Sequence, residues 1–164
     1  ILLNNFLSDL PSIAISTDNV DAELVTQPQR WDVHEVRRFM IVFGLISTVF
    51  DLLTFLVLMK LFEADEATFQ TAWFVVSLLT ELAVVLVLRT RRLAWRSAPG
   101  RTLLWTTLAV AAFALFIPYL GHAAMVFGFV PLGVQLAGAM VLIALAYILA
   151  TEGAKVRFYR ARNP

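Results

Sequence analysis

The sequence predicts an all-α fold, a polytopic bundle of transmembrane helices with one partial and four complete membrane crossings. Hydrophobic residues make up 60% of the 164 positions, only 15% are charged, and the mean hydropathy is +0.79. Soluble domains usually lie nearer half apolar and a quarter charged. The apolar residues gather into runs of about twenty, which is the length that crosses a hydrocarbon core. Cysteine is absent, which excludes disulfides and thiolate metal sites.

The predicted elements follow one another along the chain. A partial transmembrane helix covers residues 1–17, and a polar cytoplasmic connection follows over residues 18–38. A C-terminal membrane region over residues 39–150 holds the four complete crossings, and a basic cytoplasmic tail covers residues 151–164. The four crossings are predicted over residues 39–62, 69–88, 103–120 and 130–150. No basic segment precedes the first apolar run, so it is not a signal peptide, and we expect the sequence to begin within a membrane helix.

Basic residues predict which side of the membrane each connection faces. Residues 89–101 carry five arginines and no acidic residue, and residues 151–164 are also rich in Lys and Arg. Lys and Arg accumulate in cytoplasmic loops, so both regions and the C-terminus are predicted on the cytoplasmic side. Because the positive charge lies on one membrane face, nucleic acid is not an expected partner.

Acidic residues occur within the predicted crossings, at Asp9, Asp51 and Glu81. A charged side chain at the centre of a membrane helix costs at least about 2.5–3.5 kcal/mol, so each needs a physical reason. Asp51 and Glu81 each lie roughly 18 Å into their crossings, and Asp9 lies roughly 12 Å from the cytoplasmic end of the first helix. We therefore expect these carboxylates to share about the same depth.

Polar residues at helical spacing accompany each of the acids. Carboxylate, amide and hydroxyl oxygens are the ligands that Mg²⁺ and Ca²⁺ prefer, so these faces are candidate cation sites. Hydrogen bonds between helices are the alternative role for such stripes, especially for the Ser and Thr side chains. The stripes are Asn5, Ser8, Asp9 and Ser12 on the first helix, Gly44, Ser47, Thr48, Asp51 and Thr54 on the second, and Ser77, Thr80 and Glu81 on the third.

Proline follows the first of these acids, at Pro11. It removes one backbone hydrogen bond from a helix and frees a carbonyl. Transporters use discontinuous helices to present such carbonyls to ions. The alternative is a packing kink without a chemical role.

The segment Asn5-Phe6-Leu7-Ser8-Asp9-Leu10-Pro11 resembles the sixth membrane helix of P-type ATPases. In order and spacing the resemblance covers about residues 1–105, and it is to the C-terminal transmembrane region of the magnesium-transporting branch. Its further segments are Ser16-Thr17-Asp18-Asn19-Val20-Asp21, Pro28-Gln29-Arg30-Trp31-Asp32, Arg37-Arg38-Phe39-Met40, Phe50-Asp51-Leu52-Leu53-Thr54-Phe55, Trp73-Phe74 and Leu86-Val87-Leu88-Arg89-Thr90.

The resemblance implies a membrane-domain fragment of an ATP-driven cation pump that transports Mg²⁺ across the bacterial cytoplasmic membrane. It implies Asn5, Ser8 and Asp9 as metal-site residues, with Glu81 at a position where some members of the family place a liganding glutamate. The magnesium branch tends to carry glutamate where this chain has Val76, so Ca²⁺, Na⁺ and H⁺ stay open as alternative cargo. For Asp51 the resemblance implies a structural role.

The family's chemistry implies partners and limits for this chain. Mg²⁺ is implied as the transported ion and, in the parent enzyme, as the companion of ATP. The expected partners are the remaining transmembrane helices and cytoplasmic domains of the same pump, the lipid bilayer and the cation. The sequence contains no phosphorylation motif and no phosphate loop, so we expect no catalytic or cofactor-binding residue in it. A stand-alone membrane scaffold or regulatory subunit is the alternative from a different class.

Overall fold

The computed structural model describes residues 2–19 and 32–160, and within these residues it is helical, with no strand. A 3₁₀ turn follows the first helix, and a π-helical turn, Val57–Leu61, extends the second. The helices are α1 (Leu2–Ala14), α3 (Val33–Leu56), α4 (Glu66–Leu88), α5 (Arg101–Phe116), α6 (His122–Val126) and α7 (Val134–Arg160).

Four of the described helical segments are long and apolar enough to cross a membrane. They are Val33–Leu61, Glu66–Leu88, Arg101–Tyr119 and Val134–Arg160. The predicted helical membrane bundle with four complete crossings is therefore confirmed, and the chain is an integral membrane protein.

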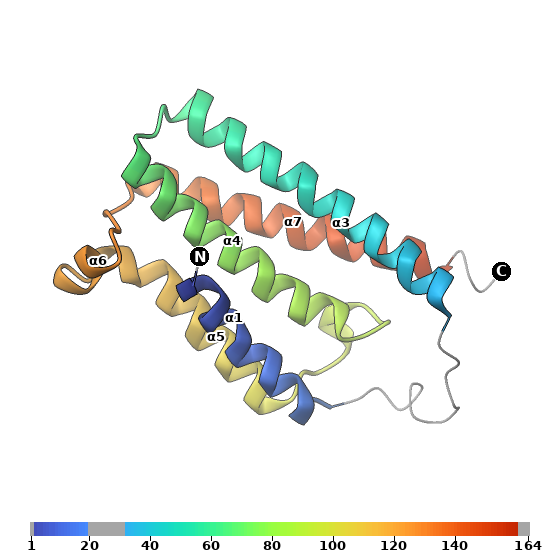
Figure 1. Ribbon diagram of the computed structural model, residues 1–164. Helices are drawn as coiled ribbons and strands as arrows, with labels where there is room; N and C mark the ends of the chain where they lie inside the picture. Colours follow the sequence, from blue (N-terminus) through green and yellow to red (C-terminus); the bar gives the residue numbers. More distant parts are fainter. Residues whose placement is uncertain (1, 20–31, 161–164) are drawn as a thin grey trace.

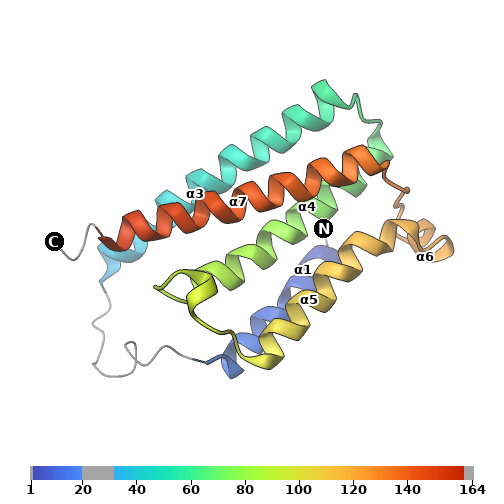
Figure 2. The ribbon, with the colours of Figure 1, turned by 180° about the vertical axis from the view of Figure 1, so that it is seen from behind.

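Helix α4 lies at the centre of the bundle. In Figures 1 and 2 it runs between α7, which α3 covers, and the pair formed by α1 and α5. Half of its most apolar stretch is buried, compared with 17% for α3. The core it contributes includes Ala72, Val75 and Leu78, all at most 1% exposed. Because α4 is packed on several sides, it is apolar around most of its circumference.

Large apolar side chains cover the outside of the bundle. On α3 alone, Leu45, Val49 and Leu52 are 63%, 61% and 59% exposed. Contiguous apolar surface of this kind marks contact with a membrane or another protein. The outer face of α3 is therefore suited to lipid.

Several helix ends differ from the sequence-based expectation, because hydropathy reports where the apolar run ends and not where the helix ends. Helix α3 begins at Val33 instead of residue 39, since the carboxylate of Asp32 caps it by accepting the His34 N–H at 2.9 Å. Helix α7 continues to Arg160 instead of ending at residue 150, and Glu152 and Lys155 are buried in this extension.

The short helix α6 lies in the outer connection before α7, which starts at Val134 instead of residue 130. Most of the predicted connection over residues 18–38, including the resemblance segments at residues 20–31, lies outside the described residues. The last residues of the predicted tail, 161–164, lie outside them too.

Candidate cation site

Helix α1 meets α4 through one polar contact at membrane depth. The side-chain amide of Asn4 donates to Oε2 of Glu81 at 3.0 Å. The other amide atom of Asn4, Oδ1, is buried without a hydrogen-bond partner in the described structure. Glu81 is therefore the predicted site residue of α4 that contacts α1. Its partner is Asn4, which lies next to the predicted Asn5.

The sequence-based prediction chose Asn5 and not Asn4, because it placed the polar stripe of α1 one residue away from the face that packs. The buried face of α1 consists of Leu7, Ser8, Pro11 and Ala14, and Asn4 continues this face with i, i+3 and i+4 spacing. The predicted stripe through Asn5 and Asp9 lies about 100° further round. The apolar Leu7, Pro11 and Ala14 were the available signal, since an apolar face is the one that packs.

The other predicted residues on α1 divide between the buried and the open face. Ser8 is 5% exposed, and its hydroxyl donates to the carbonyl of Asn5 at 3.0 Å. Asn5 and Asp9 are exposed, and within the described residues neither side chain has a hydrogen bond or an ion pair. Asp9 lies roughly 7.5 Å further along the helix axis than Asn4, so it is not level with the Asn4–Glu81 contact.

Pro11 does not break α1. The helix is continuous from Leu2 to Ala14, with Pro11 buried inside it. A break in the helix at Pro11, one of the two interpretations that the sequence left open, is therefore not seen in the described residues. The packing kink remains as the interpretation, although the ring still leaves the Leu7 carbonyl without its usual helical donor.

An open groove of ≈ 780 Å³ lies beside the Asn4–Glu81 contact. It runs between the start of α1, the first half of α4 and the connection before α7. Asn4 and Asn5 both line it, so the open face of α1 reaches a space far larger than a single ion. Its full lining is Leu2, Leu3, Asn4, Asn5, Phe69, Gln70, Trp73, Phe74, Ser77, Phe127 and Phe129.

The acid of the second stripe lies in a different place. Asp51 borders a cavity of ≈ 30 Å³ between α3, α4 and α7, which Ser77 and Thr80 also line. The polar stripe of α4 is therefore split, with Glu81 turned to α1 and Thr80 turned to α3. Among the described residues no three His, Cys, Asp or Glu side chains gather closely enough to hold a metal ion.

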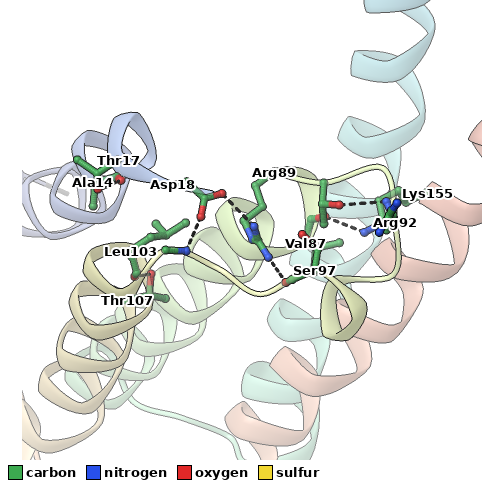
Figure 3. A network of polar contacts seen from close by, with 12 residues as sticks. Ala14, Thr17, Asp18, Val87, Arg89, Arg92, Ser97, Leu103, Thr107 and Lys155 are labelled. Carbon is green, nitrogen blue, oxygen red and sulfur yellow. Dashed lines mark hydrogen bonds and ion pairs between the residues drawn. The ribbon is translucent and has the colours of Figure 1, made fainter. Parts of the chain in front are cut away.

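The C-terminal end of α1 is attached to the connection between α4 and α5 (Figure 3). Asp18 pairs with Arg89 at 2.9 Å, and its other oxygen accepts the Gly100 N–H at 2.6 Å. The same guanidinium donates to the carbonyl of Ser97. Both side chains of the pair are at most 9% exposed. The sequence alone gives no sign of this contact, because Asp18 and Arg89 are 71 residues apart in the chain.

A second buried ion pair lies within α7, and its lysine, Lys155, contacts Val87 of α4 (Figure 3). Nζ of Lys155 lies 3.0 Å from the Glu152 carboxylate and donates to the Val87 carbonyl at 2.8 Å. The other oxygen of Glu152 accepts the Ala94 N–H at 2.9 Å. Since Val87 lies in the last turn of α4, this pair also supplies a donor to a helix end that lacks one.

Comparison with known proteins identifies relatives of this chain. Residues 1–157 match the family described as "Cation transporting ATPase, C-terminus". The chain is 40% identical over 124 residues to a magnesium-transporting ATPase, P-type 1, of Salmonella typhimurium strain 14028s, which covers 73% of this chain and 14% of that protein. The match to the protein of the same description in Escherichia coli K12 is 39% over 124 residues, with the same coverage of 73% and 14%.

A further relative with that description, from Salmonella typhimurium strain LT2, is 33% identical over 167 residues, which cover 99% of this chain and 18% of the relative. The chain thus spans less than a fifth of the length of these proteins. The resemblance to P-type ATPases of the magnesium-transporting branch is confirmed, and the chain belongs to the cation-transporting ATPase C-terminal family.

Proposed function

We propose that this chain is a membrane-domain part of an ATP-driven pump that transports Mg²⁺. The observation that carries the proposal is a pair of adjoining membrane helices, α1 and α4, with the carboxylates of Asp9 and Glu81 at membrane depth. Among the described residues neither carboxylate has a cationic partner. An intramembrane acid without a partner is costly, and a transported cation would supply the missing positive charge.

The proposed site is built from Asn5, Ser8, Asp9 and Glu81. Asp9 and Glu81 supply the charge, and the Asn5 amide and Ser8 hydroxyl supply neutral oxygens. Since Asn5 and Asp9 lie on an open face of α1, other helices of the same pump are proposed to pack there and complete the site. The Asn4 amide holds the Glu81 carboxylate in position from the side.

Three observations support Mg²⁺ as the cargo. The relatives are described as magnesium-transporting ATPases. Oxygen ligands, with carboxylates among them, suit this hard cation. Mg²⁺ also loses its water reluctantly, and the groove of ≈ 780 Å³ beside Asn5 has room for a hydrated ion.

The location and the partners follow from the same proposal. The basic connection between α4 and α5 and the basic end of α7 support a cytoplasmic C-terminus in a bacterial cytoplasmic membrane. Cytoplasmic domains of the pump would form and hydrolyse a phosphorylated intermediate and thereby drive alternating access to the site. The remaining membrane helices, these domains, the lipid bilayer and the cation are the proposed partners.

Replacing Asp9 in a pump that carries this segment tests the proposal. Asp9→Asn keeps the size and removes the charge, so Mg²⁺-stimulated ATP hydrolysis in membrane vesicles should be lost while the protein stays inserted at normal abundance. The matched control is Asp65→Asn, an exposed acid at the start of α4, which should retain wild-type turnover. Wild-type turnover in Asp9→Asn would remove Asp9 from the site. Stimulation by Ca²⁺ or Na⁺ in place of Mg²⁺ would reassign the cargo.

A further inference from the structure

A small polar cavity lies on the other side of α4 from the proposed Mg²⁺ site, between α3, α4 and α7. Its volume is ≈ 30 Å³. Thr54 and Tyr147 are 2% and 3% exposed, whereas Asp51 is exposed. Six of the lining residues carry side-chain oxygen atoms, namely Ser47, Asp51, Thr54, Ser77, Thr80 and Tyr147.

Four of the five hydroxyls that line this cavity make hydrogen bonds, whereas that of the fifth, Ser77, makes none among the described residues. Ser47 donates to the Phe43 carbonyl at 3.1 Å, and Thr54 donates to the Phe50 carbonyl at 2.8 Å. Thr80 donates to a carbonyl one turn back in α4 at 3.0 Å. Tyr147 lies 2.9 Å from Ser47 Oγ, and because the Ser47 proton points to its own helix, Tyr147 is the donor in this pair. The hydroxyls of Ser47, Thr54, Thr80 and Tyr147 therefore keep lone pairs for an occupant, which favours a cation.

Charge and size narrow the identity of the cation. The lining has a single carboxylate, and Asp51 has no ion pair within the described residues. One positive charge neutralises it, whereas a divalent ion would leave an excess charge in a low-dielectric setting. A volume of ≈ 30 Å³ holds one water-sized body and leaves no room for the water shell that Mg²⁺ retains.

We propose that this cavity binds one monovalent metal cation, with Asp51 as the charged ligand and the hydroxyls of Ser47, Thr54, Thr80 and Tyr147 as neutral ligands. The bound cation joins α3, α4 and α7 and neutralises Asp51 at membrane depth. The site is distinct from the proposed Mg²⁺ site, because Glu81 faces α1 and takes no part in this cavity. It therefore adds a function that the Mg²⁺ proposal neither requires nor supplies.

Thermal unfolding of the purified protein in detergent tests this site. NaCl or KCl is titrated against choline chloride at constant pH, constant chloride and zero Mg²⁺. The wild-type unfolding midpoint should rise and saturate with Na⁺ or K⁺ and should not respond to choline. Asp51→Asn should abolish the response, because it removes the charged ligand.

Conservative variants separate cation binding from packing. Tyr147→Phe and Thr80→Val each delete one neutral ligand, so each should raise the half-saturating cation concentration about two- to tenfold. The matched control is Thr107→Val, a buried hydroxyl on α5 that donates to Leu103 at 2.7 Å and lies outside the cavity. This control should leave the half-saturating concentration unchanged.

The outcomes decide between this site and its absence. The proposal is overturned if the wild-type thermal unfolding midpoint does not change with Na⁺ or K⁺. It is also overturned if the midpoint of Asp51→Asn still rises with these ions. An equal shift in Thr107→Val and Thr80→Val also overturns it. If Asp51→Asn does not fold, Tyr147→Phe and Thr80→Val carry the test. Asp9→Asn should keep the wild-type response to Na⁺ or K⁺, so failure of the Mg²⁺ proposal and failure of this one are distinguishable.

Discussion

The end of the bundle that holds the connection between α4 and α5 accommodates charge differently from the interior. At this end, Asp18 pairs with Arg89 and Glu152 pairs with Lys155, with side chains at most 9% exposed. Inside the predicted crossings, the described part of the chain offers no ion-pair partner to Asp9, Asp51 or Glu81. In the described residues, the charges that hold helices together are therefore paired with other charges of the same chain. We infer that its intramembrane acids are kept for cations from outside the chain.

The difference is also one of hydrogen-bond satisfaction. Lys155 donates to the Val87 carbonyl at the end of α4 in addition to forming its ion pair. Asp18 accepts hydrogen bonds from a backbone N–H and from the Arg89 guanidinium. Such additional contacts offset the desolvation of a buried ion pair. Nε of Arg89 is the exception, because it is buried without a hydrogen-bond partner in the described structure. The Glu81 carboxylate, by contrast, accepts a hydrogen bond only from the neutral amide of Asn4 within the described chain. Each half of this comparison can be tested by substitution.

The largest expected effect is at Lys155. Lys155→Met leaves Glu152 buried without a cation and removes the donor to Val87, so the free energy of unfolding should fall by about 3–5 kcal/mol. Denaturant unfolding in mild detergent measures the change. The double variant Glu152→Gln/Lys155→Met should recover most of the loss, and Lys60→Met, at the exposed outer end of α3, should cost little. A loss of less than about 1 kcal/mol would show that the pair is not structural.

A smaller loss is expected where α1 meets the connection between α4 and α5. A Cβ on Gly100 would lie 2.9 Å from the Thr17 carbonyl oxygen and 3.1 Å from the Asp18 Cα, both in backbone that cannot rotate away. Gly100→Ala should therefore lower the free energy of unfolding by about 1–3 kcal/mol. In Gly138→Ala the new methyl meets nothing within 4 Å, so this matched control should be neutral or stabilising. Equal stability of the two variants would contradict the close approach of α1.

The adjacent residues Asn4 and Asn5 should differ in their contribution to stability, because only the Asn4 side chain contacts Glu81 in the described structure. Asn4→Ala removes the donor to Glu81 and should lower the free energy of unfolding by about 1 kcal/mol in the absence of Mg²⁺. Asn5→Ala should change it little under the same conditions, because the Asn5 side chain has no partner in the described residues. A larger loss of unfolding free energy in Asn5→Ala than in Asn4→Ala would contradict the contact between Asn4 and α4.

The smallest expected change has the opposite sign. Glu81→Gln removes an acid that has no cationic partner in the described chain, and its side-chain oxygen can still accept from Asn4. Without Mg²⁺ its free energy of unfolding should be unchanged or higher by roughly 0–1 kcal/mol. Glu152→Gln, which removes a paired acid, is the comparison and should lose stability. A loss in Glu81→Gln as large as that in Glu152→Gln would erase the distinction between the two regions.

Composition was sufficient to predict the bundle, because each crossing is a separate apolar run bounded by charged or turn residues. It was less informative about helix ends, since Glu152 and Lys155 read as a polar tail although they are buried in a continuing helix. On α1 the helical spacing identified a polar stripe, but which polar residue faces α4 depends on the packing of Leu7 and Pro11. The Asp18–Arg89 pair joins residues 71 apart in the chain, and only the folded structure reveals it.

Equilibrium binding of Mg²⁺ to a pump that carries this segment tests the central claim most directly, by calorimetry with wild type, Asp9→Asn and Gly100→Ala. The intramembrane acids are proposed to serve the cation and the cytoplasmic contacts to serve the fold. Asp9→Asn should therefore lower the affinity at least about tenfold, which is about 1.4 kcal/mol. Gly100→Ala should retain the wild-type affinity despite its lower stability. An unchanged Mg²⁺ affinity in folded Asp9→Asn would contradict the claim.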